Sequence, residues 1–524
     1  MQASTATPQP AWTVWKTAAL LTVLVVVSRW PFRSHALFSW DSANFAMALD
    51  RIDIAMHRPH PPGYLGYVFA ARALRLIFRE ANTALVVWNL VATMLAGLVT
   101  AIFALEVADR ERRSLTAVAA TAIILSSPLV WFYGEVAEIY VSELLFAALV
   151  GLTAARAARG STRAMYACVA ALAFTAAFKV VTAFLVFPVV AFAWTRVSPQ
   201  TRRRSFGLAA LAAAAVIVLF MAVQPDLWRV ASRLAGSSEW SIWSFNSDRE
   251  DLFRLLNRNL RNVMTAAVIA VGLVNVAGLA WWAIRDRRLP AGLNRGIAWA
   301  WALPILLFTV VLVIAKPGYL LPFLPLAAVI LGGFYARFTP NTAVALVAAQ
   351  ALVNVGHFLW MTPFFPSMTG GELRYQDKAF PQRMASDLQA LTFPTRFTIR
   401  ESDRRVQDLL SFAATCPERT RLIVVDTAPV DWRRVMFYLP EATAIHAGAV
   451  GVDFVGRHTD FAPIPPEGSD FTTTCSVIWL SPDTGPGGVA APKDAPLTPI
   501  PRLGWSTAAG TLHVTPAAVV VAAP

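Results

Sequence analysis

Long apolar segments recur along the first 360 residues of this chain. Each is about 17–25 residues long and rich in Ala, Leu and Val without strand-like alternation, a pattern typical of membrane-spanning helices. The sequence therefore predicts a mainly α-helical transmembrane bundle. We expect about 11 spans, at 13–29, 83–107, 115–132, 138–156, 163–178, 180–196, 205–223, 263–284, 296–315, 317–336 and 341–360.

Two long polar loops, 30–82 and 224–262, interrupt the apolar pattern, which ends at about residue 360. Beyond that point hydrophobicity falls, prolines cluster, and short strand-like runs appear at 421–426 and 475–480. We predict a transmembrane module over 1–360 and a C-terminal extramembrane mixed α/β domain over 361–524.

Residues 64–78, within the first polar loop, are apolar enough to be considered as another span. Arg72, Arg75 and Arg79 recur there at helical spacing, which favours an amphipathic helix lying on the membrane surface. With this segment excluded from the spans, the arginine-rich short loops all fall on one side, around residues 110–113, 156–163, 196–204, 285–295 and 337. By the positive-inside rule that side is cytoplasmic.

This sidedness predicts a multi-pass protein, which we assign to a bacterial inner (plasma) membrane, with a cytoplasmic N-terminus and a periplasmic C-terminal domain. Residues 14–27 resemble an uncleaved signal anchor. Of the three cysteines, Cys168 lies in an apolar span, whereas Cys416 and Cys475 could form a disulfide if the C-terminal part faces an oxidising compartment.

Composition agrees with a membrane protein, because 56% hydrophobic and 15% charged residues could not cover a soluble surface. The net charge of +13 would suggest nucleic acid as the partner of a soluble domain. Here much of the arginine lies in loops between spans, and the remainder suits anionic headgroups or a phosphate-bearing lipid. We therefore expect membrane lipids as partners and no nucleic acid.

Asp41, in the first polar loop, is the foremost candidate for chemistry. It opens a predicted short helix over 41–49, for which Ser39 is available as a cap. A carboxylate in a first helical turn is favoured as the anion, which suits a base or a group that orients a hydroxyl. The alternative is that Asp41 only caps the helix, and the sequence supports both interpretations equally.

Further charged candidates lie on the same predicted outer side. Glu135 and Glu138 follow the third span and either line a cavity with the aspartate or anchor the membrane interface. Lys316 and Tyr319 lie at the mouth of one span, and Lys179 lies between two others. These side chains either hold a lipid phosphate or extend to the interface as ordinary anchors.

His57 and His60 are three residues apart, so metal binding must be considered. No neighbouring cysteine or third histidine completes a ligand set, and we predict no metal ligands here. The sequence contains no Walker loop, dinucleotide glycine motif or Ser-His-Asp elbow. It predicts no organic cofactor and leaves a requirement for a divalent metal open.

Taken in order, these elements resemble the GT-C membrane glycosyltransferases, above all the group of the protein O-mannosyltransferases and the bacterial lipid A aminoarabinose transferases. The resemblance covers about residues 10–360. It is carried by Asp41 in Trp40-Asp41-Ser42, by Pro61-Pro62-Gly63-Tyr64, by Glu135 or Glu138, by Lys179, and by Lys316, Tyr319 and Pro322. The chain departs from the family at Ser42, where a glutamate is frequent, and at Val180, where a glycine is frequent.

The resemblance implies inverting transfer of a sugar from a polyprenyl-phosphate-linked donor to a hydroxyl of a protein, glycan or lipid acceptor, on the outer face of the membrane. It implies Asp41 as base or acceptor-orienting group. The substrate-binding residues would be Glu135, Glu138, Lys179, Lys316, Tyr319, His60 and Tyr64. The alternatives are a lipid or small-molecule transporter, which would be expected to show inverted repeats and charges near the midplane, and a membrane scaffold.

Overall fold

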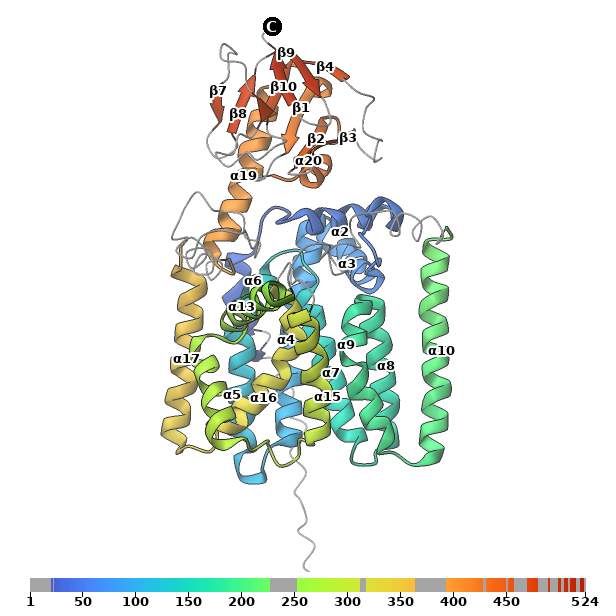
Figure 1. The fold of residues 1–524 in the computed structure, drawn as a ribbon, viewed down its shortest axis with the longest axis vertical. Coiled ribbons are helices and arrows are strands. Elements are labelled where there is room, and N and C mark those ends of the chain that lie inside the picture. The colour runs from blue at the N-terminus through green and yellow to red at the C-terminus, as the bar shows by residue number, and fades with distance from the viewer. Residues whose placement is uncertain are drawn as a thin grey trace, which may run out of the picture.

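The structure is a computed structural model. It describes residues 20–226 apart from 22, and residues 252–311, 317–362, 393–426, 430–448, 451–456, 469–478, 489–490, 498–500, 504–507, 509–514 and 519–522. A bundle of helices forms one part of the molecule, and a part built around β-sheets stands over one end of it (Figure 1). Helix α19 (Arg396–Thr415) rises from the bundle into this sheet part (Figure 1).

The helices of the bundle coincide in position with the expected spans. They are α4 (Ala81–Val107), α5 (Arg113–Ser126), α6 (Pro128–Glu135), α7 (Tyr140–Ala157), α8 (Thr162–Phe178), α9 (Val180–Thr195), α10 (Pro199–Val223), α13 (Leu252–Val271), α14 (Leu273–Trp281), α15 (Arg295–Val311), α16 (Leu324–Tyr335) and α17 (Pro340–Trp360). Among the described residues, five helices are long and apolar enough to cross a membrane, or up to seven if each bent pair is one span. The other four expected positions hold apolar helices of 10–17 residues. The chain is thus an integral membrane protein, but the expected number of about 11 spans is not confirmed.

Two expected spans are bent rather than straight. In the span expected at 115–132, α5 and α6 meet at 55°, because Pro128 starts a new helix for which the Ser127 hydroxyl is the N-cap. In the span expected at 263–284, two helices meet at 109°. Gly272 lies at the second bend with a φ of +89°, a conformation that glycine adopts without strain, and an added Cβ would lie 1.9 Å from Asn354 Oδ1.

The second expected loop, 224–262, ends earlier than predicted because α13 begins at Leu252. The first turns of α13 were predicted as part of the polar loop because three arginines are interspersed among their apolar positions: Arg254, Arg258 and Arg261. Residues 227–251 lie outside the described part of the chain.

The first outer loop folds into short helices that lie across the end of the bundle, below the sheet part (Figure 1). They are η1 (Trp30–Phe32), α2 (Trp40–Asp50), η2 (Ile54–Met56) and α3 (Leu65–Phe78). The arginines that distinguished α3 from a span hold the end of α2. Arg72 donates to the Ala48 and Leu49 carbonyls at 2.8 and 3.0 Å, and Arg75 pairs with Asp50 at 2.5 Å. Cations at a helix C-terminus satisfy its last carbonyls and its dipole.

The arginine-rich loops gather at the end of the bundle that faces away from the sheet part (Figure 1). Arg110, Arg112, Arg288 and Arg337, from three different loops, line one hollow there. A further loop joins them through Arg159, which donates to the Gly292 carbonyl at 3.3 Å. These loops thus lie together, as the sidedness pattern requires.

The sheet part contains the strands β1 (Leu422–Asp426), β2 (Thr443–Gly448), β3 (Gly451–Gly456), β4 (Ser469–Thr473), β5 (Cys475–Ile478), β6 (Val489–Ala490), β7 (Thr498–Ile500), β8 (Gly504–Thr507), β9 (Gly510–Val514) and β10 (Val519–Ala522). They form a six-stranded sheet of order β3-β2-β1-β5-β8-β7 and a four-stranded sheet of order β4-β9-β10-β6. Strand β1 runs parallel to both its neighbours. The strands predicted within 421–426 and 475–480 are confirmed.

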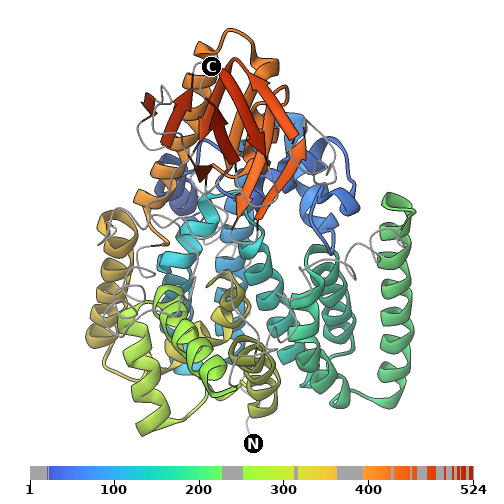
Figure 2. The same cartoon turned by 45° about the horizontal axis from the view of Figure 1, so that its top comes forward.

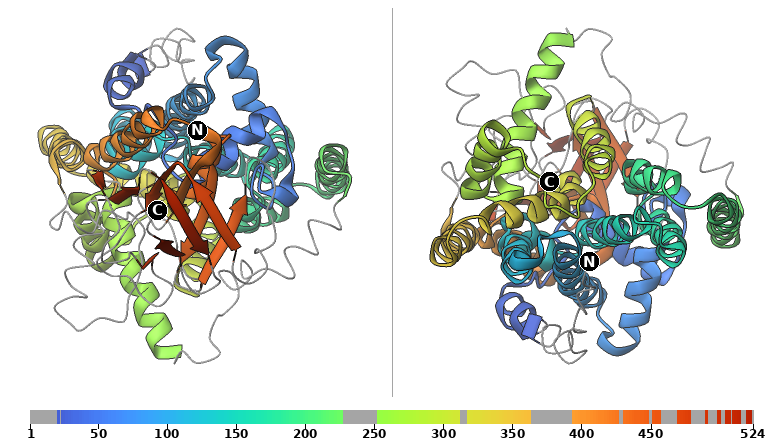
Figure 3. Two further views of the ribbon diagram at one scale, coloured as in Figure 1. Left: turned by 90° about the horizontal axis from the view of Figure 1, so that it is seen from above. Right: turned by 90° about the horizontal axis from the view of Figure 1, so that it is seen from below.

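Helices α19 and α20 (Trp432–Tyr438) pack on the larger sheet through an apolar core that includes Val406, Leu409, Val424 and Val435. Figure 2 shows the sheet part at the top of the molecule, and Figure 3 shows α10 at the periphery of the bundle.

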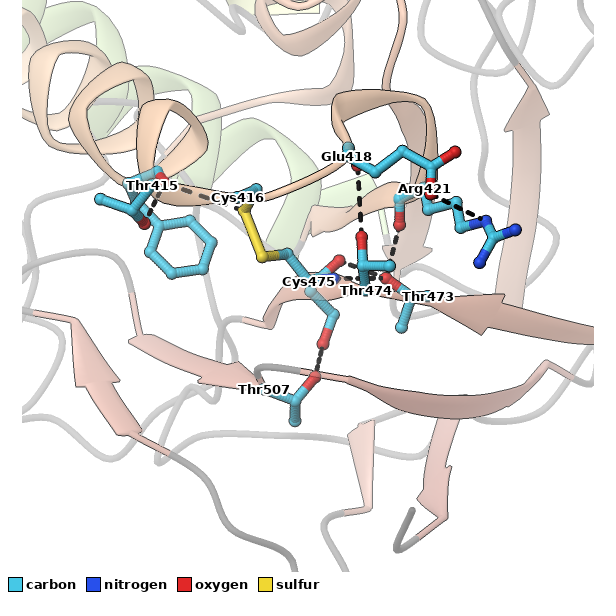
Figure 4. The surroundings of a disulfide bond; sticks show 10 residues. Thr415, Cys416, Glu418, Arg421, Thr473, Thr474, Cys475 and Thr507 are labelled. Carbon is cyan, nitrogen blue, oxygen red and sulfur yellow. Dashed lines mark hydrogen bonds and ion pairs between the residues drawn. A yellow bond between two sulfur atoms is a disulfide. The ribbon is translucent and has the colours of Figure 1, made fainter.

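A disulfide between Cys416 and Cys475 ties the end of α19 to β5 (Figure 4). Their Cα atoms are 5.8 Å apart. Thr473 reinforces the junction, since its hydroxyl donates to the Arg421 carbonyl at 2.5 Å. The disulfide that the sequence allowed is therefore present, and Cys168 is buried and free.

Candidate functional site

Asp41 lies in the first turn of α2, where the sequence predicted a short helix. Ser39 is the N-cap, because its hydroxyl accepts from the Ser42 amide while the Ser42 hydroxyl accepts from the Ser39 amide, both at 3.3 Å. This reciprocal pair is a capping box. The cap is thus Ser39, and the Asp41 carboxylate instead faces His60, whose Nδ1 lies 3.6 Å from Asp41 Oδ1.

Aromatic rings fix the His60 imidazole beside this carboxylate. The ring centroids of Trp40, Phe45 and Tyr64 lie 5.8, 5.4 and 4.6 Å from that of His60. Gly63 shapes the turn between His60 and α3. Its φ is +112°, and a Cβ there would lie 2.7 Å from Ile54 Cδ1, so a larger residue would strain the turn.

The two glutamates that follow the third expected span have different surroundings. Glu138 accepts a hydrogen bond from the Ser39 hydroxyl, which places it at the N-terminus of α2. Glu135 is fully buried, with Arg29 and Arg396 as its nearby cations, and neither carboxylate oxygen has a hydrogen-bond partner within the described ranges. The structure thus brings Glu138, rather than Glu135, to the helix that carries Asp41.

Lys179 is buried where α8 meets α9, with 3% of its side chain exposed. Its Nζ lies 2.6 Å from Glu143 Oε1, and the other oxygen of Glu143 accepts from the Thr182 hydroxyl. The same ammonium lies 4.4 and 4.2 Å from the ring centroids of Tyr140 and Tyr319. We call these five residues the lysine cage; aromatic faces and a carboxylate together stabilise a desolvated cation.

Tyr319 enters the lysine cage from η5 (Pro317–Phe323), the short helix that precedes α16. Gly318 permits this approach, because a Cβ there would lie 2.4 Å from the Tyr140 ring. Lys316, predicted next to Tyr319, lies outside the described residues.

Tyr64 connects the Asp41 side of the site to the lysine cage. Burial raises the pKa of its phenol well above the usual range, and the charges of nearby groups raise it further: Tyr319, Asp41, Glu143 and Glu138. These groups come from α2, the α6–α7 junction, α7 and η5. The charges of Asp41 and of two lysine-cage residues thus all act on this one phenol. A carboxylate and a caged cation in the same region of a fold can serve to hold a hydroxyl and an anionic phosphate.

Two members of the lysine cage, Tyr140 and Thr182, were missed by the sequence reasoning. Glu143 was noticed for its depth in the span but was not assigned to the site. Glu143 and Tyr140 are one turn apart on α7, and this spacing was the available signal. No group of three or more His, Cys, Asp or Glu side chains is placed to hold a metal ion in the part of the chain that the structure describes.

No protein-family model and no curated protein sequence matches this chain. Among solved structures, ArnT from Cupriavidus metallidurans bound to undecaprenyl phosphate superposes with a TM-score of 0.53 at 14% identity, over 82% of this chain and 85% of that one. The apo state of that ArnT gives a TM-score of 0.47 at 16% identity, with the same coverage of 82% and 85%. The apo oligosaccharyltransferase of Archaeoglobus fulgidus gives 0.41 at 12% identity, over 82% of this chain and 64% of that one. The likeness to undecaprenyl-phosphate-bound ArnT shows that this chain shares the fold of that protein, the GT-C fold.

Proposed function

We propose that this chain is an integral membrane glycosyltransferase. It moves a sugar from a polyprenyl-phosphate-linked donor to an acceptor hydroxyl of a protein, glycan or lipid, with inversion at the anomeric carbon. The observation that carries the proposal is the lysine cage, a buried ammonium within a GT-C fold whose first outer loop presents the Asp41 carboxylate beside His60. The ArnT that shares this fold was solved with undecaprenyl phosphate, a ligand of the same chemical class.

In the proposed reaction Asp41 accepts or orients the proton of the acceptor hydroxyl, whose oxygen attacks the anomeric carbon as the bond to the carrier phosphate breaks. His60 is close enough to keep the carboxylate in place. A positioned base contributes roughly 10²–10⁴-fold to the rate of such a step.

The leaving group is the carrier phosphate, which gains negative charge as the sugar departs. Lys179 and the Tyr319 hydroxyl would stabilise that charge in a site screened from water, where such interactions are strong. Lys316 would add a second cation, by its position in the sequence next to Tyr319. Glu138 and Tyr64 would line the space between phosphate and acceptor. Glu135, whose nearby cations are Arg29 and Arg396, would act only indirectly.

The reaction would take place on the outer face of the membrane. The arginine-rich loops lie at the end of the bundle opposite to α2 and the sheet part (Figure 1), and such loops face the cytoplasm by the positive-inside rule. The Cys416–Cys475 disulfide agrees with an oxidising, extracytoplasmic location for the sheet part.

The test is a transfer assay with purified protein in lipid vesicles and a panel of radiolabelled polyprenyl-phosphate sugars. Asp41→Asn is compared with wild type and with Asp50→Asn, which removes an exposed carboxylate at the other end of α2. We expect one donor to be consumed by wild type and Asp50→Asn, and turnover to be lost in Asp41→Asn while donor binding is kept. Consumption of no donor by wild type would refute the enzyme and favour a transporter. Equal turnover in all three proteins would remove Asp41 from the mechanism.

A further inference from the structure

The chain segment just before α2 is held by side chains of the sheet part. Three consecutive backbone amides of this segment donate hydrogen bonds to the sheet part. The amides of His35 and Ala36 donate to the two carboxylate oxygens of Asp403, each at 2.9 Å. The amide of Leu37 donates to the Tyr438 hydroxyl at 2.8 Å. Asp403, on α19, is 7% exposed. Buried N–H groups without partners are costly, so the conformation of this segment depends on these two side chains.

A second attachment lies on the other side of α2. Arg433, on α20, is 1% exposed and donates to the Met56 carbonyl at 2.7 Å. Its guanidinium lies 4.4 Å from the ring centroid of Trp432, which in turn lies 6.2 Å from that of Trp40 at the start of α2. The sheet part thus forms hydrogen bonds with the first outer loop both before and after the helix that carries Asp41.

The phosphate side of the site has a different support. Lys179, Glu143 and Tyr319 come from the α8–α9 junction, α7 and η5, and the contacts that form the lysine cage are all made within the bundle. Loosening the sheet part would therefore move the Asp41 carboxylate and leave the lysine cage in place. A displacement of about 1 Å at a reacting group can lower a rate by roughly 10²-fold.

We propose that Asp403 and Arg433 are positioning residues, and that the C-terminal domain serves to hold the first outer loop so that Asp41 meets the acceptor hydroxyl. This inference rests on the proposed function. The competing explanation is that these contacts only dock the sheet part on the bundle, in which case their loss would lower stability without altering the turnover of the folded protein.

The experiment uses the full-length protein in lipid vesicles or nanodiscs, with Asp403→Ala, Arg433→Met and Arg433→Lys. The matched control is Glu401→Gln. It removes a carboxylate of the same helix that pairs with Arg405, also on α19. The first readout is amide hydrogen exchange over residues 34–58, and the second is the separation of kcat from the KM for donor.

We expect exchange at residues 35–37 to rise by roughly tenfold or more in Asp403→Ala, because hydrogen bonds to a charged group are among the stronger ones. We expect kcat to fall at least roughly tenfold in Asp403→Ala and Arg433→Met, with the KM for donor unchanged. Arg433→Lys keeps one N–H donor for the Met56 carbonyl and recovers part of kcat, and Glu401→Gln behaves as wild type.

Unchanged exchange in Asp403→Ala overturns the inference whatever the activity. Raised exchange with wild-type kcat also overturns it, since the loop would then be held without being positioned for the reaction. If wild type consumes no donor, the proposed function fails, and the exchange data alone still decide whether the domain holds the loop.

Discussion

The buried pair of Lys179 and Glu143 allows the structural and the chemical role of one lysine to be separated. The charged atoms lie 2.6 Å apart, with 3% and 1% of the two side chains exposed. Removing one member leaves the other as an uncompensated buried charge, which costs about 3–5 kcal/mol, whereas replacing both by apolar residues of similar size is often close to neutral. We therefore expect Lys179→Met and Glu143→Leu each to destabilise the protein by about 3–5 kcal/mol, and the double variant to regain most of the loss.

The assay is unfolding in detergent followed by tryptophan fluorescence, at one fixed scan rate because irreversible unfolding makes the midpoint depend on that rate. The control is the exposed pair of Arg75 and Asp50, for which Arg75→Met should change stability by at most about 1 kcal/mol. Transfer activity is measured on the same proteins. We expect no transfer by Lys179→Met or by the stabilised double variant, because neither retains the cation that we propose for the carrier phosphate. Additive destabilisation in the double variant would refute the energetic reasoning, and wild-type transfer by it would refute the role of Lys179 at the phosphate.

Three further outcomes follow from local features. Gly318→Ala should raise the KM for donor, because its Cβ would lie 2.4 Å from the Tyr140 ring of the lysine cage. The control is Gly207→Ala in α10, which has open space around it and should leave the KM unchanged. Equal KM values for the two variants would contradict this prediction. Replacing Cys416 and Cys475 by serine should destabilise the sheet part by about 4 kcal/mol, for a sequence separation of 59, and denaturant unfolding that matches the oxidised wild type would argue against it. Burial raises the pKa of Tyr438 to about 12, and since an unfolded tyrosine ionises near pH ~10, its contribution to stability is complete below that pH and is lost as the pH rises toward 12. Between pH ~10 and 12, the free energy of unfolding of Tyr438→Phe should therefore fall less than that of wild type. The same dependence of unfolding free energy on pH in both proteins would contradict the raised pKa of Tyr438.

Local patterns predicted local structure well. The apolar runs located the bundle helices, and Ser39 ahead of Asp41 marked the start of α2, because both signals act within one or two helical turns. The bend at Gly272 could not be predicted, since it depends on the approach of Asn354 from another helix.

The same limit applies to the site. Sequence order named Lys179 and Tyr319 as candidates but could not pair the lysine with Glu143, because that contact depends on how α7 packs against α9. Nor could it choose between Glu135 and Glu138, whose surroundings differ because the chain turns between α6 and α7. The attachment of Asp403 to the segment before α2 joins residues 367 positions apart, and a contact so distant in sequence has no local signal.

That attachment also has a consequence for biosynthesis. The amide of Ala36 leaves the ribosome long before its partner Asp403, which follows 367 residues later. Chains are synthesised at about 5–20 residues per second, so the segment before α2 waits tens of seconds for the side chain that fixes it. During this interval the nascent protein can insert its helices into the membrane before the loop that bears Asp41 has formed its hydrogen bonds to Asp403. Assembly of the complete site is thereby deferred at least until Asp403 has been synthesised.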